Sequence, residues 1–249
     1  MRKYAASPPL KSFKSTQLLI WLIPVAFMGV FYFFPLSKIT QLSFSQGEAG
    51  VWDGLRETLA SPAILRVIGF TFKQAAISTL LTLLVGLPGA YLFARYKFRG
   101  KKLLRALTGV PFVMPTLVVA AGFYALLGPT GWINTLLMQG LGLESPPIQF
   151  VNTFGAILTA HVFYNTTIVL RVVGDYWSRL DRRLESAARV LGAGRWATLR
   201  EITLPLLLPA LTAAALLVFI FDFTSFGVVL VLGGPTFATL EVEIYYQTI

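Results

Sequence analysis

The stretch LESAARVLGAGRWATLREITLPL, residues Leu184–Leu206, places charged residues, two glycines and a proline between two long apolar segments. Just before it, Asp181 is suited to cap a helix, because its carboxylate can accept hydrogen bonds from free backbone N–H groups. Apolar residues then recur at the spacing of one helical face: Leu184, Ala187, Ala188 and Leu191. Gly192 is placed to end this helix and Gly194 keeps the break open, so the stretch predicts a helix followed by a glycine turn.

A second short helix is predicted after the glycines, with Trp196, Leu199 and Ile202 on one side. Pro205 then begins a long apolar segment, at a position where the missing N–H of proline costs nothing. The pattern is therefore helix, glycine turn, helix and membrane-spanning helix. By composition alone, an amphipathic hairpin resting on anionic lipid explains the same residues.

The rest of the chain has the composition of an integral membrane protein. Of its 249 residues, 55% are hydrophobic and only 13% are charged, whereas a soluble domain carries about 25% charged residues. The net charge of +10 would suggest nucleic-acid binding in a soluble protein. Here it indicates basic residues in cytoplasmic loops, and no nucleic acid is expected as a partner. The chain has no cysteine, which excludes disulfides and thiolate metal sites.

Five segments are long and apolar enough to cross a membrane, which takes about 20 residues. They cover residues 17–36, 66–94, 106–127, 151–170 and 206–232. Pro111 and Pro115 predict kinks or breaks in the third segment. Pro88 predicts another in the second, although Gly86 and Ala90 beside it alternatively allow a second helix to pack closely. The predicted fold is all-α, a polytopic helical membrane protein.

Most of the 21 lysines and arginines precede the first segment, or lie between the second and third or between the fourth and fifth. The loop 128–150 and the tail after Gly233 have none. This asymmetry predicts a cytoplasmic N-terminus. The resulting parts are a cytoplasmic tail at 1–16, the first span at 17–36, an external loop at 37–65 with a short helix at 51–59, and a cytoplasmic loop at 171–205. The first segment is longer than a signal-peptide core, so an uncleaved anchor is expected.

Four polar residues lie inside the predicted spans: Lys73, His161, Asn165 and Asp222. Lys73 and Asp222 have opposite charge and similar depth, which gives the hypothesis of a paired polar cluster near an outer gate. The alternative has Lys73 extending outward alone and Asp222 at a helix break. His161 and Asn165 are one helical turn apart, and we expect them to hydrogen-bond between helices, with a substrate contact as the alternative. A single histidine is a poor metal site, and without paired carboxylates or a nucleophile elbow no metal or catalytic residue is expected.

The spacing of the opening stretch resembles the EAA loop of ATP-binding-cassette (ABC) importer permeases, whose pattern is EAA-x3-G-x9-I-x-LP. Gly192 follows Ser186 by six residues and Ile202 follows Gly192 by ten, as in that pattern. The glutamate of the pattern falls on Ser186, while Glu185 lies one residue earlier. The resemblance assigns coupling to an ATPase to Glu185, Ser186, Ala187, Ala188, Gly192, Ile202, Leu204 and Pro205.

The resemblance implies a type I permease fold in the plasma membrane of a bacterium or archaeon, with the permease domain at 66–249. In that family the loop docks into a separate cytoplasmic ATPase dimer, an external solute-binding protein delivers the solute, and a second permease half completes the path. The chain itself lacks the phosphate-binding pattern G-x-x-x-x-G-K-[ST]. No cofactor and no enzymatic activity are therefore expected on this chain, and ATP with Mg²⁺ is expected at the partner.

FKQAAISTLL from Phe72 and GLPGAYLFAR at Gly86–Arg95 resemble the opening of the permease domain of this family. Three later stretches most resemble its iron(III)/thiamine branch: FDFTSFG at Phe221–Gly227, GGP at 233–235 and TLEVEIY at 239–245. Iron(III) is the first expected substrate and thiamine the second. A half of such a permease generally has six spans, so the chain is expected to lack a sixth span and, in this branch, a fused second half. The rival functions are an ion-coupled secondary transporter and a membrane scaffold or receptor, which leave the spacing of Gly192 and Pro205 unexplained.

Overall fold

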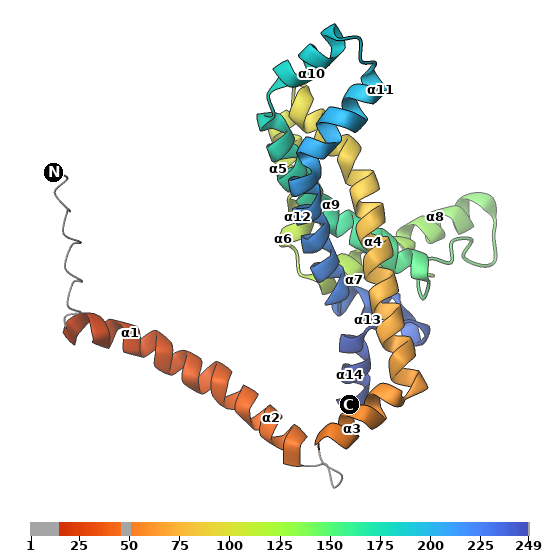
Figure 1. Cartoon of the computed structure of the whole chain (residues 1–249). Helices are drawn as coiled ribbons and strands as arrows, with labels where there is room; N and C mark the ends of the chain where they lie inside the picture. Colours follow the sequence, from red (N-terminus) through yellow and green to blue (C-terminus); the bar gives the residue numbers. More distant parts are fainter. Residues whose placement is uncertain (1–14, 46–50, 249) are drawn as a thin grey trace, which may run out of the picture. The chain divides into compact units, whose positions relative to one another are not determined.

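The computed structural model describes residues 15–45 and 51–248, which form helices joined by short connections, with no strand among them. The chain divides into two units, Met1–Ser61 and Pro62–Ile249 (Figure 1). Within the described residues, five helical stretches have the length and apolar composition of membrane spans. The all-α membrane fold predicted from the sequence is therefore confirmed, although the bounds of several helices differ.

The first unit is built around one long apolar helix. Its elements are α1 (Ser15–Met28), the π-helical segment η1 (Gly29–Phe33), α2 (Phe34–Ser45) and α3 (Val51–Ala60). The stretch suited to span a membrane is Ile20–Leu42, which extends beyond the predicted end at residue 36 because the helix continues through η1 into α2. Part of the predicted external loop is thus helical, and α3 agrees with the short helix predicted at 51–59.

The second unit contains the remaining helices. They are α4 (Pro62–Arg95), α5 (Lys101–Leu107), α6 (Val110–Val113), α7 (Thr116–Leu127), α8 (Trp132–Leu141), α9 (Phe154–Arg179), α10 (Arg182–Val190), α11 (Arg195–Thr198), the π-helical η2 (Leu199–Thr203), α12 (Leu204–Phe223), α13 (Gly227–Leu232), the 3₁₀-helical η3 (Gly234–Thr236) and α14 (Leu240–Thr248). The long helices α4, α9 and α12 pack together, while α8 lies to one side of them (Figure 1).

Small residues let α4 and α9 approach closely. A Cβ atom added at Gly86 would lie 2.7 Å from the Cβ of Val169, and one added at Gly89 would lie 2.6 Å from Cδ2 of Leu170. The core around this contact consists of Ala90, Ile168, Val169, Leu170, Val173, Trp177, Leu207, Ala214 and Val218. Because α4 runs without interruption through Pro88, the glycines beside that proline serve close packing rather than a break in the helix.

Other predicted spans are interrupted or displaced. The third breaks into α5, α6 and α7, since Met114 has the extended backbone (ψ 143°) that a following proline favours. The apolar stretch that meets the criteria for a span there is Thr116–Leu141, which includes α8. The fourth helix continues to Arg179, so the loop predicted from residue 171 begins later than expected. The fifth ends at Phe223, and α13 begins only after a short break.

Candidate functional site

The arginine-rich loop, which we define as residues 180–203, contains a helix ended by a glycine turn. Just beyond the C-cap of α10, Gly192 has a φ of +92°, a left-handed conformation that glycine adopts at little cost. The N–H of Gly192 donates to the Arg189 carbonyl and the N–H of Ala193 to the Ala188 carbonyl, both at 3.0 Å. These are the hydrogen bonds of a Schellman motif, so Gly192 ends the helix as the sequence predicts.

The two ends of the arginine-rich loop are fixed by local interactions. The Asp181 carboxylate caps α10 by accepting a hydrogen bond from the Arg183 N–H at 2.9 Å, as predicted. At the other end, one helical stretch runs from Arg195 through η2 into α12 and ends at Phe223. The wider turn of η2 lies just before Pro205, whose ring does not fit a regular helix interior. Helix, rather than a flexible linker, therefore joins this loop to the span.

A set of polar contacts ties α10 to the end of α4. The Arg95 guanidinium forms an ion pair with the Glu185 carboxylate, and these side chains are only 9% and 22% exposed. The same Glu185 oxygen accepts a hydrogen bond from the Thr203 hydroxyl at 3.1 Å. Arg182 donates to the Arg95 carbonyl at 3.0 Å, at the helix end where backbone carbonyls are free. These four residues, which we call the Arg95–Glu185 brace, join α4, α10 and η2.

The brace gives a role to Glu185, which lies one residue before the position where the EAA pattern has glutamate. Glu185 turns toward α4 and η2, whereas Ser186 is exposed and its hydroxyl donates to the Arg182 carbonyl of its own helix at 3.1 Å. The apolar face predicted for α10 is also divided, because Ala188 is buried while Ala187 is exposed. Glu185 thus contacts α4 and η2, whereas Ser186 and Ala187 are exposed.

Large apolar side chains remain exposed around the glycine turn. Val190 is 86% exposed, Leu191 88% and Trp196 70%, and we call these three residues the apolar tip. Because burying one such side chain stabilises by about 1.5–3 kcal/mol, an exposed group of them is typical of a surface that contacts another protein or the membrane. The other residues assigned to coupling lie where the chain enters α12: Ile202 and Leu204 are half-buried, and Pro205 is exposed.

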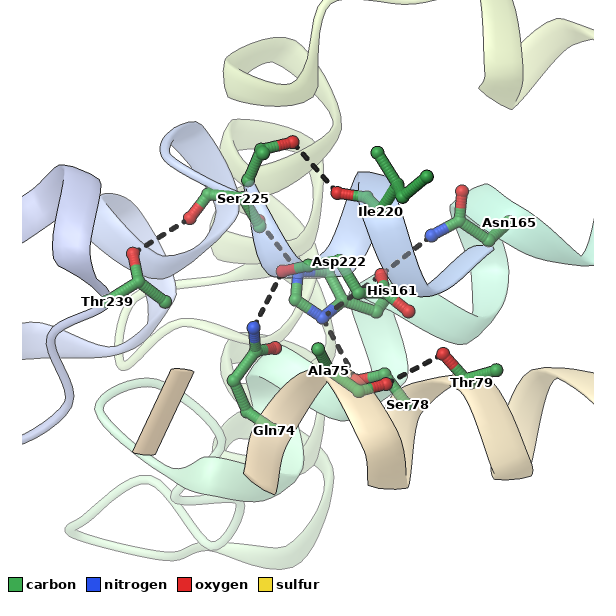
Figure 2. A network of polar contacts seen from close by, with 11 residues as sticks. Gln74, Ala75, Ser78, Thr79, His161, Asn165, Ile220, Asp222, Ser225 and Thr239 are labelled. Atoms are coloured by element: carbon green, nitrogen blue, oxygen red, sulfur yellow. Dashed lines mark hydrogen bonds and ion pairs between the residues drawn. The ribbon is translucent and has the colours of Figure 1, made fainter. Parts of the chain in front are cut away.

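A second group of polar residues lies inside the helix bundle, at the end of α12 (Figure 2). This buried polar cluster consists of Gln74 and Ser78 from α4, His161 and Asn165 from α9, and Asp222 and Ser225 at the break between α12 and α13. All six side chains are buried. Polar groups at membrane depth must find partners within the protein, so their contacts decide how the surrounding helices pack.

Hydrogen bonds of the cluster cross between helices. The ring of His161 lies between two hydroxyls, with Nδ1 3.1 Å from Ser78 Oγ and Nε2 2.7 Å from Ser225 Oγ. Asn165 donates from Nδ2 to Asp222 Oδ1 at 2.7 Å. The same carboxylate oxygen lies 3.4 Å from Nδ1 of His161. His161 and Asn165 therefore make contacts between helices, as expected from the sequence.

The structure does not bring Lys73 and Asp222 together. Lys73 is exposed, whereas its neighbour Gln74 is buried and donates from Nε2 to the Asp222 backbone carbonyl at 2.6 Å. Successive side chains on a helix point about 100° apart, so the residue beside an inward-facing Gln74 faces elsewhere. The pairing hypothesis is corrected accordingly: Asp222 lies in the last turn of α12, at a helix break, and contacts Asn165 instead.

The α4 side of the cluster was not predicted. Thr71, Gln74, Ser78 and Thr82 are buried at spacings of three and four residues, which is one helical face. This polar stripe is readable in the sequence, but uncharged residues give a weak signal within an apolar helix. As for metals, the described part of the chain holds no group of three or more His, Asp or Glu side chains that could bind one ion.

Both sites fall largely within a region that matches a known family. Residues 83–248 match the model described as the binding-protein-dependent transport system inner membrane component. The chain belongs to this family. Its fold is the type I ABC permease fold, and the chain is a membrane-spanning permease subunit of an ABC importer.

Sequence relatives of this permease carry several substrate names. The putative 2-aminoethylphosphonate transport system permease protein PhnU of Salmonella typhimurium is 26% identical over 234 residues, covering 93% of this chain and 82% of that protein. The molybdenum transport system permease protein ModB of Azotobacter vinelandii is 36% identical over 172 residues, covering 68% and 73%. The probable sulfate transport system permease protein cysT of Prototheca wickerhamii is 30% identical over 203 residues, covering 82% and 77%.

Solved structures share the fold at lower identity. A bacterial ABC transporter that imports the acidic polysaccharide alginate matches this permease with a TM-score of 0.71 and 19% identity, over 94% of this chain and 84% of that one. The alginate transporter in complex with its alginate pentasaccharide-bound periplasmic protein matches with a TM-score of 0.67 and 21% identity, over 92% and 81%. These matches support the helical arrangement and carry no information on the substrate.

Proposed function

We propose that this permease moves a small charged solute from an external binding protein across the plasma membrane by alternating access. A separate ATPase supplies the energy, and the arginine-rich loop transmits it. The observation that carries the proposal is the rigid attachment of the loop on both sides. The Arg95–Glu185 brace attaches it to α4, and the helical stretch Arg195–Phe223 attaches it to α12. A displacement of α10 would therefore move two spans together, as a rigid body.

The apolar tip is the proposed contact with the ATPase. Val190, Leu191 and Trp196 would fill an apolar groove in the manner of a helix bound in a groove. The arginines around them would pair with acidic groups at the rim of that groove. ATP and Mg²⁺ bind to the ATPase in this scheme, and this chain contributes neither a cofactor site nor a catalytic residue.

The proposed assembly contains two ATPase subunits, an external solute-binding protein and a second permease half, either fused to this chain or separate. The alginate transporter solved with its periplasmic protein supports the solute-binding partner. In the lipid bilayer, a bacterial or archaeal plasma membrane, the basic arginine-rich loop and the N-terminus are proposed to face the cytoplasm. In this scheme, the permease domain at 66–249 carries the transport path.

The proposed substrate class is broader than the two solutes expected from the sequence resemblance. The expectation of iron(III) or thiamine depends on short stretches such as FDFTSFG at Phe221–Gly227. The relatives reported above are named for 2-aminoethylphosphonate, molybdenum and sulfate, and none of them for iron or thiamine. A small charged solute is the description common to all of these.

The coupling role is tested by co-purification of this chain with candidate ABC ATPases. Leu191→Asp places a charge in the apolar tip, and Leu141→Asp places one on another exposed leucine, in α8. Since a buried leucine contributes about 1.5–3 kcal/mol, we expect Leu191→Asp to lower ATPase recovery at least about tenfold. Leu141→Asp should recover as much ATPase as the parent.

Two outcomes would contradict the proposed function. Equal ATPase recovery with Leu191→Asp and Leu141→Asp would remove the loop as the coupling surface. Uptake into vesicles that follows an ion gradient and needs no ATP would instead identify an ion-coupled secondary transporter. A panel of labelled 2-aminoethylphosphonate, sulfate, molybdate, iron(III) and thiamine in the same vesicles would identify the substrate.

A further inference from the structure

A cavity of about 190 Å³ lies against the buried polar cluster, where α12 ends. Its inner wall includes Asp222, Asn165 and His161, all of which are buried. Its rim includes Phe221 and Thr224, which are exposed. The cavity therefore leads from the surface of this chain to a carboxylate at membrane depth. Ionisable groups at that depth usually face protein or a watery path rather than lipid.

Two residues that line the inner wall each have an acceptor oxygen without a partner among the described residues. Asp222 Oδ1 accepts from Asn165, but Asp222 Oδ2 accepts nothing, and neither does Oδ1 of Asn165. Both side chains are almost completely buried, at 0% and 1% exposure. A buried acceptor without a donor is costly, more so when it is charged. The wall is thus short of hydrogen-bond donors and of positive charge.

The position of Asp222 adds to the negative potential of the cavity. It lies in the last turn of the 20-residue helix α12, and the C-terminal end of a helix carries partial negative charge. A carboxylate is unfavourable at such an end unless a cation neutralises it. The cavity lining contains no lysine or arginine, and Lys73 on α4 is exposed and makes no ion pair with Asp222. His161 lies close, but both of its ring nitrogens already face Ser78 and Ser225.

We propose that this cavity binds an organic ammonium group carried by the transported solute. An ammonium group supplies both the donors and the charge that the inner wall lacks. Aromatic side chains of Tyr164, Phe221 and Phe226 also line the cavity, and aromatic faces attract organic cations. A bare metal ion fits less well, because only one carboxylate and one imidazole are present.

The role in transport rests on the proposed function, but binding itself does not. Among the solutes named for the relatives, 2-aminoethylphosphonate carries an ammonium group, whereas sulfate and molybdate carry none. The cavity therefore favours an amine-bearing solute over a bare oxyanion.

The test is equilibrium binding of radiolabelled methylammonium to the purified full chain in lipid nanodiscs, without any partner. We expect saturable binding that weakens at least about tenfold in Asp222→Asn, which keeps the shape of the side chain and removes its charge. Asp175→Asn is the matched control, because Asp175 is an exposed carboxylate paired with Arg105 outside the cavity. The control should bind methylammonium like the parent. Equal binding in Asp222→Asn and the parent would overturn the proposal.

A second comparison does not depend on how well Asp222→Asn folds. The unaltered chain should bind methylammonium more tightly than uncharged acetamide or anionic acetate, and Asp222→Glu, which restores the charge, should keep this order. A parent chain with no preference for methylammonium would overturn the proposal. Because no ATPase is present in this assay, equal ATPase recovery with Leu191→Asp and Leu141→Asp, together with retained methylammonium binding, would refute the proposed function alone.

Discussion

At the scale of single residues, one ion pair decides how the arginine-rich loop is held. Arg95 is nearly buried, so its guanidinium depends on protein acceptors, and the Glu185 carboxylate provides one. Thr203 satisfies the same carboxylate from the opposite side of the loop. Removing one charge of such a pair leaves the other charge without a partner, and this costs more stability than the pair itself contributes. Glu185 is therefore a structural residue of the loop, although it lies beside the position of the pattern's glutamate.

The Arg95–Glu185 brace predicts that substitutions of its two charged residues have non-additive effects on the free energy of unfolding. Arg95→Met and Glu185→Gln should each destabilise the protein by about 1–3 kcal/mol, because each leaves a partner without its charge. The double variant should be destabilised by about 1 kcal/mol or more less than the sum of the two single-variant effects. The measurement is equilibrium unfolding of the purified protein.

Ser186→Glu serves as the control for this cycle. It restores the glutamate of the pattern at an exposed position, so the free energy of unfolding should change by no more than about 0.5 kcal/mol. If the two brace variants proved additive, Arg95 and Glu185 would not act as a pair.

At the scale of elements, the loop is a helical connection with one bend. The bend is at Gly192, and beyond Gly194 the helix continues as far as Phe223. At 1.5 Å per residue, this stretch of 29 residues is about 43 Å long. One helical stretch therefore runs from the base of the apolar tip to Asp222 in the buried polar cluster, with the π-helical η2 and Pro209 within it.

The bend predicts that alanine substitutions at Gly192 and Gly194 have different effects on the free energy of unfolding. Gly192→Ala places a Cβ on a residue with φ of +92°, which costs about 1–2 kcal/mol in an L-residue. Gly194 has φ of −66°, which alanine adopts freely, so Gly194→Ala should be close to neutral. Unfolding free energies of the two variants provide the measurement, and ATPase co-purification should fall for Gly192→Ala alone. An equal effect of both substitutions would mean that the left-handed conformation at Gly192 is not required.

At the scale of the whole molecule, the distribution of basic residues predicts which segments face the cytoplasm. The arginine-rich loop carries many of them, while the stretch 128–150, which includes α8, carries none. Ser186 and Glu144 are exposed positions on these two segments. They are suited to a topology measurement because the sequence has no cysteine of its own.

The predicted topology is tested with single cysteines. On intact cells, a membrane-impermeant maleimide should label Glu144→Cys directly, and Ser186→Cys only after the membrane is permeabilised. The cysteine-free parent is the control for background labelling. Labelling of Ser186→Cys in intact cells would reverse the proposed orientation and remove the loop from reach of a cytoplasmic ATPase.

Local signals in the sequence predicted the local features well. Asp181 caps α10, Gly192 ends it, and the apolar segments form long helices, because capping, chirality and apolar length act over a few neighbouring residues. Break positions were harder to predict. The fifth span ends at Phe223 rather than at residue 232, at a point where Asp222, Thr224 and Ser225 place three polar residues close together.

The sequence by itself determined that this protein is a helical membrane permease with a glycine-bent loop, since hydropathy, charge asymmetry and the spacing of Gly192 and Pro205 are all read along the chain. Only the tertiary structure decided the partners of its polar groups. Arg95 meets Glu185 across 90 residues, and Asn165, rather than Lys73, meets Asp222. The physical reason is helical phase: neighbouring residues face different directions, so which face of each span is buried depends on the helices packed against it.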